Sequence, residues 1–148
     1  RVRRVGREVE PMIRSMISNA IGEAFPDATI YKEQASQIER PAFYIGEIKI
    51  SQAKAMGNRY YREHQMVVRY FPLEDGLTDY EALSAIADKL YACLEYLEYD
   101  GWRGRGYNMN HRIEDNMLQF YLTVQLALKR PTNDPKMEHI QTDTKLKE

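Results

Sequence analysis

The sequence predicts an α+β fold, in which two helices pack on one face of a mostly antiparallel sheet. Two segments place apolar residues three and four positions apart, as helices with one buried face do. Other segments alternate apolar and polar residues, which is typical of strands. Their order along the chain predicts the arrangement α-β-β-β-α-β-β. At 148 residues the chain fits a single domain, which we expect over residues 11–130.

The first helix is expected at about residues 11–24, and Pro11 fits its first turn because a proline there loses no helical hydrogen bond. Residues 1–10 are expected to form a separate basic arm, either helical or extended, because Arg1, Arg3, Arg4 and Arg7 make it positively charged. Phe25-Pro26-Asp27 ends the helix. The apolar stripe of the helix consists of Met12, Ile13, Met16, Ile17, Ala20 and Ile21.

The strands are expected at residues 29–32, 41–51, 59–71, 107–114 and from 118 onward. The last pattern is the most regular, and its even-numbered residues from 118 to 128 are expected to face the core. Asp115-Asn116 precede it and tolerate a positive φ, so residues 107–114 are expected to be its hairpin partner. In the second strand, Phe43 and Ile45 are expected on one face, with Tyr44, Ile48 and Ile50 on the other.

The second helix is expected to begin at the capping box Thr78–Glu81, in which Thr78 is the N-cap, and to end near Asp100. The polar segment 131–148 contains two prolines and is expected to be a mobile tail. The buried stripe of the helix consists of Leu83, Ile86, Ala87, Leu90, Leu94 and Leu97.

The composition indicates a soluble protein of the cytoplasm. Cys93 is the only cysteine, so no disulfide can form within the chain, as suits a reducing compartment. No apolar run approaches the ~18 residues that span a membrane, and the sequence shows no hydrophobic region of the kind that signal peptides contain.

The residues that carry chemistry are few and scattered. His64, His111 and His139 lack metal-ligand spacing with one another or with Cys93, and the first two are expected at the surface. No serine lies in the G-x-S-x-G context of a nucleophile elbow. We therefore expect no enzyme activity, no metal and no cofactor.

The sequence instead favours a protein that works by contacting other proteins. It contains 11 tyrosines, which are enriched at interfaces, although many of them will simply cover the core. Opposed charged segments suit self-association, and the alternative is solvated charge on exposed faces. The segment Ser51–Asn58 is expected to project as a loop, or to be a plain hairpin connection. The expected interface residues are Lys54, Met56, Arg59, Tyr60, Tyr61, Arg62, Arg69, Asp79, Asp88 and Glu95.

A nucleic-acid-binding module is an alternative from a different class. Gly101–Gly104 matches the GXXG loop of KH domains, and Arg105–Tyr107 matches the opening of an RRM strand signature. A KH loop joins two helices, whereas this one is expected to join a helix to a strand. A helix cap followed by a hairpin entry explains the same glycines, so direct nucleic-acid binding by the arm and this loop is not favoured.

An ordered set of segments along the chain matches one known family: Met12–Phe25, Ile30–Gln34, Arg40–Ile45, Gly57–Arg62, Val68–Pro72, Leu90–Leu97, Glu114–Asn116 and Leu118–Tyr121. Over residues 12–130 the chain thereby resembles the bacteriophage tail terminator family of long-tailed phages and prophages of Gram-positive bacteria. One departure is Asn116, where the family usually has glycine.

The resemblance implies a structural virion protein that acts without chemistry. Such terminators form a ring, typically a hexamer, that caps the tail tube, stops its polymerisation and offers a surface to head-completion proteins. The implied partners are further copies of the chain, the tail-tube protein and a head-completion protein, with no membrane. The implied location is the virion tail, with assembly in the host cytoplasm. Another component of the head–tail connector is a further alternative.

Overall fold

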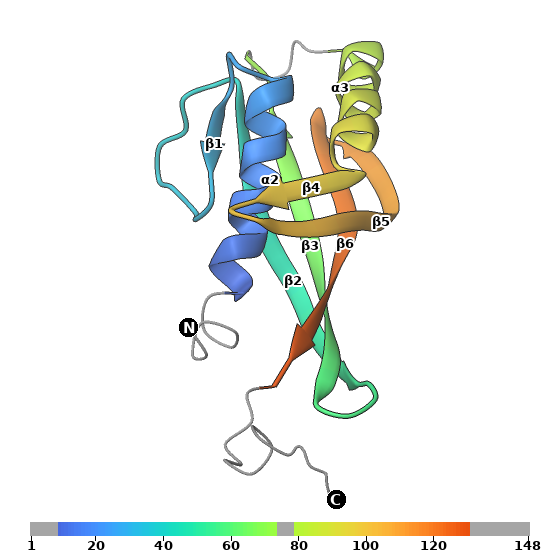
Figure 1. Cartoon of the computed structure of the whole chain (residues 1–148). Helices are drawn as coiled ribbons and strands as arrows, with labels where there is room; N and C mark the ends of the chain where they lie inside the picture. The colour runs from blue at the N-terminus through green and yellow to red at the C-terminus, as the bar shows by residue number, and fades with distance from the viewer. Residues whose placement is uncertain (1–8, 74–78, 131–148) are drawn as a thin grey trace, which may run out of the picture.

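The computed structural model describes residues 9–73 and 79–130, which form two helices against a six-stranded sheet (Figure 1). The strand order is β1-β2-β3-β6-β5-β4, and only β1 runs parallel to its neighbour. The expected α+β class is thereby confirmed. The elements are α2 (Val9–Ala24), β1 (Thr29–Tyr31), β2 (Ala42–Lys54), β3 (Arg59–Phe71), α3 (Tyr80–Cys93), β4 (Tyr96–Tyr99), β5 (Trp102–Glu114) and β6 (Met117–Lys129).

A single hydrophobic core lies between the two helices and one face of the sheet. The even-numbered residues of β6 from Leu118 to Leu128 are buried, as their alternation predicts. From α2, the apolar stripe contributes Ile13, Ile17 and Ile21, all without exposed surface. Because both helices bury their apolar stripes in this one core, no described helix packs on the other face of the sheet, which we call the outer face.

The helix starts differ from those expected. The first helix, α2, begins at Val9, two residues before the expected start at about residue 11. Residues 1–8 and 131–148 lie outside the described residues, so the basic arm and the mobile tail stay predictions. In α3 the N-cap is Asp79, whose carboxylate accepts the Ala82 N–H at 2.8 Å. The expected cap, Thr78, lies outside the described residues and is one position too early.

The second helix ends before the residue expected from the sequence, and the described part of the chain contains one strand more than the sequence predicts. Helix α3 ends at Cys93, and Tyr96–Tyr99 form β4. Asp100 and Gly101 have φ of 53° and 82° and turn the chain into β5. Leu94 and Leu97 are buried in the core, as their spacing predicts, but they lie after the helix and in β4 rather than on a helix face.

A bulge in β2 reverses the faces of its second half. The register slips between Glu47 and Lys49, so Ile48 is the extra residue and is 53% exposed. After the slip, Ile50 lies opposite the buried His64, on the face of Phe43 and Ile45 rather than the one expected. The strands also continue to Lys54, so the predicted Ser51–Asn58 loop shrinks to a turn at residues 55–58. At the other end of the sheet, Asp115 and Asn116 have positive φ and join β5 to β6, as predicted.

The first half of β5 approaches the helices closely, because glycines face them. A Cβ on Gly106 would lie 2.3 Å from the carbonyl oxygen of Leu94, a contact that real Cβ atoms do not make. A Cβ on Gly104 would lie 3.1 Å from the terminal methyl of Met16 on α2. The sheet can therefore curl, so that its edges β1 and β4 lie on either side of α2 (Figure 1).

We predict that Gly106→Ala lowers the free energy of unfolding by more than about 2 kcal/mol, because the added methyl meets backbone that cannot move aside. Gly104→Ala is the matched control and should cost less, since its methyl meets only side-chain atoms, the terminal methyl of Met16 at 3.1 Å and Val124 Cγ1 at 3.3 Å. Urea unfolding of both variants tests this. Equal losses would contradict the packing described here.

Candidate assembly interface

Beyond the ends of β1 and β5, three strands continue as a projecting ribbon (Figure 1). We call residues 51–62 and 126–130 the extension. In it β3 is paired on both sides, whereas β2 and β6 each have one edge that no described strand covers. Unpaired edges present rows of backbone donors and acceptors that can pair with another chain. The extension is therefore a place where another protein can add on.

The tip of the extension is tied down by hydrogen bonds. The Ala55 N–H donates to the Arg59 carbonyl at 2.9 Å. Asn58 and Arg130 bond reciprocally, since the Arg130 N–H donates to the Asn58 carbonyl at 2.6 Å and the Asn58 side-chain amide donates to the Arg130 carbonyl at 3.0 Å. Gly57 has a φ of 66°, which permits the tight turn. These bonds hold the hairpin turn against the end of β6.

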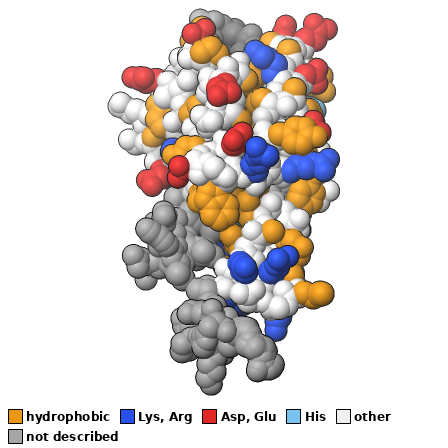
Figure 2. All heavy atoms as spheres, viewed as in Figure 1, with side chains coloured by type: hydrophobic (Ala, Val, Ile, Leu, Met, Phe, Trp, Pro, Cys, Tyr) orange, Lys and Arg blue, Asp and Glu red, His pale blue; other side chains and the backbone are white. Residues whose placement is uncertain are grey.

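All charged residues of the extension are basic: Lys54, Arg59, Arg62, Lys129 and Arg130. On the face shown in Figure 2, Asp and Glu side chains lie over the body of the molecule, and the charged side chains seen on the extension are Lys and Arg. Because these charges all have the same sign, they sum to a positive potential, and the extension attracts acidic surfaces.

The predicted interface residues of this region are placed differently from one another. Met56 is 81% exposed at the tip, whereas Tyr60 is only 5% exposed and lies beneath the Arg62 and Arg130 guanidinium groups. Tyr61, on the opposite face of the strand, is 42% exposed. Tyr60 therefore supports the extension from within, and Tyr61 is the tyrosine that a partner can contact.

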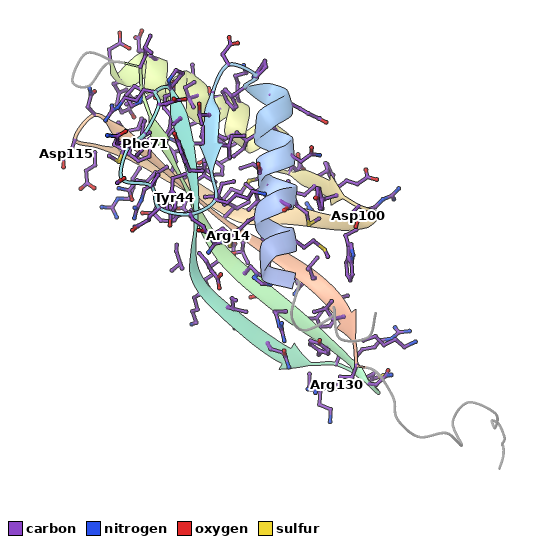
Figure 3. All side chains as sticks on the ribbon, turned by 90° about the vertical axis from the view of Figure 1, so that its left-hand side faces the viewer. Arg14, Tyr44, Phe71, Asp100, Asp115 and Arg130 are labelled. Atoms are coloured by element: carbon purple, nitrogen blue, oxygen red, sulfur yellow. The ribbon has the colours of Figure 1, made fainter. Side chains whose placement is uncertain are left out.

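Arg69 does not join this group. It stands at the other end of β3, about 33 Å from Arg59 at the usual rise per residue of a strand. Its guanidinium lies 5.8 Å from the centre of the Tyr44 ring, beside a small cavity of about 160 Å³. Figure 3 shows Tyr44 in the body and Arg130 at the far end of the extension.

The predicted acidic residues lie in the body. Asp79 caps α3, Asp88 is exposed on the same helix, and Glu95 is half-buried just after it. A second acidic group is not predicted from the sequence: Glu23 of α2 lies in one groove with Glu98 and Asp100. No signal in the sequence connects these residues, because the missed strand β4 places two of them beside α2.

The outer face of the sheet carries a hydrogen-bonded polar cluster. The Tyr107 hydroxyl donates to Glu63 Oε2 at 2.5 Å, and the Gln125 amide donates to the same oxygen at 3.3 Å. Burial raises the pKa of Tyr107 to about 12, and the hydrogen bond and charge of Glu63 add to the rise. The cluster therefore fixes a polar surface next to the extension.

The described part of the chain holds no group of three His, Cys, Asp or Glu side chains that could bind a metal ion. His64 is fully buried, so its predicted surface position is wrong, and His111 is half-buried with Nδ1 2.8 Å from the Tyr91 hydroxyl. Burial raises the pKa of the Cys93 thiol to about 11, which keeps it protonated and weakly reactive.

Of the residues that suggested a nucleic-acid loop, Gly101 lies in the turn before β5 and the others lie in β5 itself. Gly104 and Gly106 belong to β5 and face the helices, so close packing accounts for them. Arg103 and Arg105 are exposed on that strand. Among the described residues, no helix is long and apolar enough to cross a membrane.

Comparison with known proteins identifies the family. The model of a family described as "Phage tail terminator protein" matches residues 12–136. The chain belongs to the phage tail terminator family. As a terminator it is a structural protein of a phage tail, which confirms the expected family, while the Gram-positive host stays a prediction.

The fold of this terminator is also found in a virion particle. A chain of the solved structure "Virion of native gene transfer agent (GTA) particle" superposes with a TM-score of 0.50 at 11% sequence identity. The match covers 78% of this terminator and 93% of that chain. At this identity the likeness concerns the fold alone. Among curated proteins, none matches the sequence.

We predict that Glu63→Gln lowers the pKa of Tyr107 below about 12 but leaves it above 10.0, because burial remains after the charge is removed. The difference in tyrosinate absorbance between each protein and its Tyr107→Phe variant measures this pKa. Since the pKa is raised in the folded state, the stability that Tyr107 contributes is present below pH 10.0 and is lost as the pH rises toward about 12. An unchanged pKa in Glu63→Gln would show that the contact with Glu63 does not raise it, and ionisation near 10.0 in the unsubstituted terminator would contradict the burial of Tyr107 as well.

Proposed function

We propose that this terminator forms a ring on the end of the tail tube, stops the polymerisation of the tube and presents a surface to a head-completion protein. Its partners are further copies of itself, six in the ring that the family resemblance implies, together with the tail-tube protein. It acts by binding, in the virion tail and in the host cytoplasm during assembly. No step of this function requires a bond to be made or broken.

The observation that carries the proposal is the extension, a ribbon with two uncovered strand edges and only basic charge. A ring needs each copy to present two different surfaces, so that one meets its counterpart on the next copy. The extension supplies one surface. The acidic residues Asp79, Asp88 and Glu95 lie on the body and add to the negative charge that a complementary surface on the next copy needs.

The other predicted interface residues lie in the extension or elsewhere in β3. Lys54, Met56 and Arg59 lie at or next to the tip, and Tyr61 and Arg62 follow along β3. We propose that they face ring neighbours or the tube. Tyr60 is buried beneath them and holds them in position, while Arg69 would contact a neighbour only through the opposite end of the sheet.

We predict that a phage without this protein makes tail tubes longer than those of the parent phage, because nothing caps the growing end. Electron microscopy of the tails measures their length, and restoring the protein in trans is the control. Tails of unchanged length without attached heads would instead indicate another head–tail connector component. Tails of unchanged length with heads would refute the proposal.

We also predict that the purified protein associates with itself, at least in the presence of tail-tube protein. Sedimentation velocity measures this, and rising salt should weaken the association because opposed charges hold it. The proposal would be contradicted if the protein stayed a strict monomer at high concentration, both alone and with tail-tube protein.

A further inference from the structure

A groove of about 650 Å³ lies between the second half of α2 and the strand β4, which is an edge of the sheet. Asn19 and Glu23 of α2 line one wall, and Tyr96, Glu98 and Tyr99 line the other. Asp100 and Gly101, the turn from β4 to β5, close one end, and Cys93 also lines the groove. The Asn19 amide lies 3.5 Å from the Glu98 carbonyl oxygen and links the two walls.

The charge of the groove has one sign. Its charged lining residues are Glu23, Glu98 and Asp100, and none of the described lysines and arginines lines it. Lys89 reaches its rim through a hydrogen bond of 3.3 Å to the Ala24 carbonyl. Carboxylates gathered in a groove attract a cationic occupant, and the attraction is stronger where water is displaced.

Exposed tyrosines accompany this charge. Tyr96 is 72% exposed and Tyr99 is 41% exposed, although both are large and partly apolar. Tyrosine rings provide a favourable surface for arginine, lysine and methionine side chains. The groove is therefore shaped for a segment that carries positive charge next to an apolar side chain.

The tip of the extension has this composition. Lys54 and Arg59 flank Met56, whose side chain is 81% exposed. Hydrogen bonds already hold the turn against the end of β6, so binding would not have to order it. No other described turn combines an exposed methionine with flanking cations.

The tip cannot reach the groove of its own chain. Figure 3 shows Asp100, which closes the groove, beside α2, and Arg130, which is bonded to the tip, at the far end of the extension. The three-stranded ribbon between them is held by continuous pairing from Arg59 to Tyr70. If the tip occupies such a groove, it therefore comes from a second copy.

We propose that the groove between α2 and β4 receives the tip of the extension of a second copy of this chain. Lys54 and Arg59 of the incoming tip face the carboxylates, and Met56 packs against the tyrosines. The inference rests on the proposed ring and names the contact between its copies. Each copy then uses its tip and its groove on two different neighbours.

Charge reversal tests the contact. Glu23→Lys/Glu98→Lys in the full chain should raise the concentration needed for half-association by about tenfold or more, because like charges would face each other. Sedimentation velocity, alone and with tail-tube protein, measures this. Glu33→Lys/Glu39→Lys is the control, since it changes the net charge equally on exposed residues outside the groove.

Reversal of the tip separates a contact from a folding defect. Lys54→Glu/Arg59→Glu should weaken association as strongly, and mixing this variant with Glu23→Lys/Glu98→Lys should restore it. A misfolded groove variant would not be restored by a partner with the opposite charges. Restoration that is no greater than with the control variant would overturn the proposal.

Cross-linking gives an independent measurement. In a Cys93→Ser background, Met56→Cys in one preparation and Tyr96→Cys in another should form a disulfide between copies on mild oxidation of the assembled mixture. Replacing Tyr96→Cys by Glu33→Cys is the matched control and should give at least tenfold less product.

The outcomes separate this inference from the proposed function. Rings that form normally with the charge-reversed groove, or cross-link no better than the control, overturn the groove contact and leave the terminator ring standing. An unsubstituted chain that never associates, with or without tail-tube protein, overturns both.

Discussion

The close approach of the β5 backbone to the end of α3 is the constraint on which the shape of this terminator depends. The Gly106 N–H donates to the Glu95 carbonyl at 3.1 Å, and a side chain at Gly106 would strike the Leu94 carbonyl. With Gly104 packed against α2, the strand can fold over the core instead of standing away from it. This curl brings β4 next to α2 and so creates the groove between them.

At the extension the strands project away from the core instead of packing over it. There β2, β3 and β6 continue beyond the ends of β1 and β5, and the outer edges of β2 and β6 are not covered by any described strand. An uncovered edge commonly carries lysines, and Lys49 and Lys54 stand on the free edge of β2. These charges discourage random pairing with other sheets. They leave the edge open to a partner whose surface is acidic, and such selectivity weakens with salt because the Debye length is about 8 Å at physiological ionic strength.

Much of the fold could be predicted from the sequence because alternation and helical spacing reflect burial directly. The bounds of β3 and the buried face of β6 were predicted in this way, and Asp115-Asn116 correctly marked the last turn. The sixth strand was missed because Leu94 and Leu97 fit both a helix and a short strand. The bulge at Ile48 was missed as well, since one added residue reverses a face without changing the composition.

The candidate site was harder to predict, because a surface depends on which elements meet. The cations of the tip could be found from the sequence, as a basic segment next to a glycine turn. The burial of Tyr60 beside the exposed Tyr61 follows only from the register of β3, and the acids of the groove come together only through β4. A surface formed by segments that are distant in the sequence has no local sequence pattern from which it could be predicted.

The separation of the two charged surfaces bears on how copies can associate. If the basic tip of one copy binds the acidic groove of the next, that next copy still has a free tip, and the contact is heterologous rather than self-complementary. Heterologous contacts continue from copy to copy until the rotation between copies closes a ring. The rigid, hydrogen-bonded tip fixes this rotation more narrowly than a flexible loop would. A ring of defined size can therefore arise from one chain with two complementary surfaces.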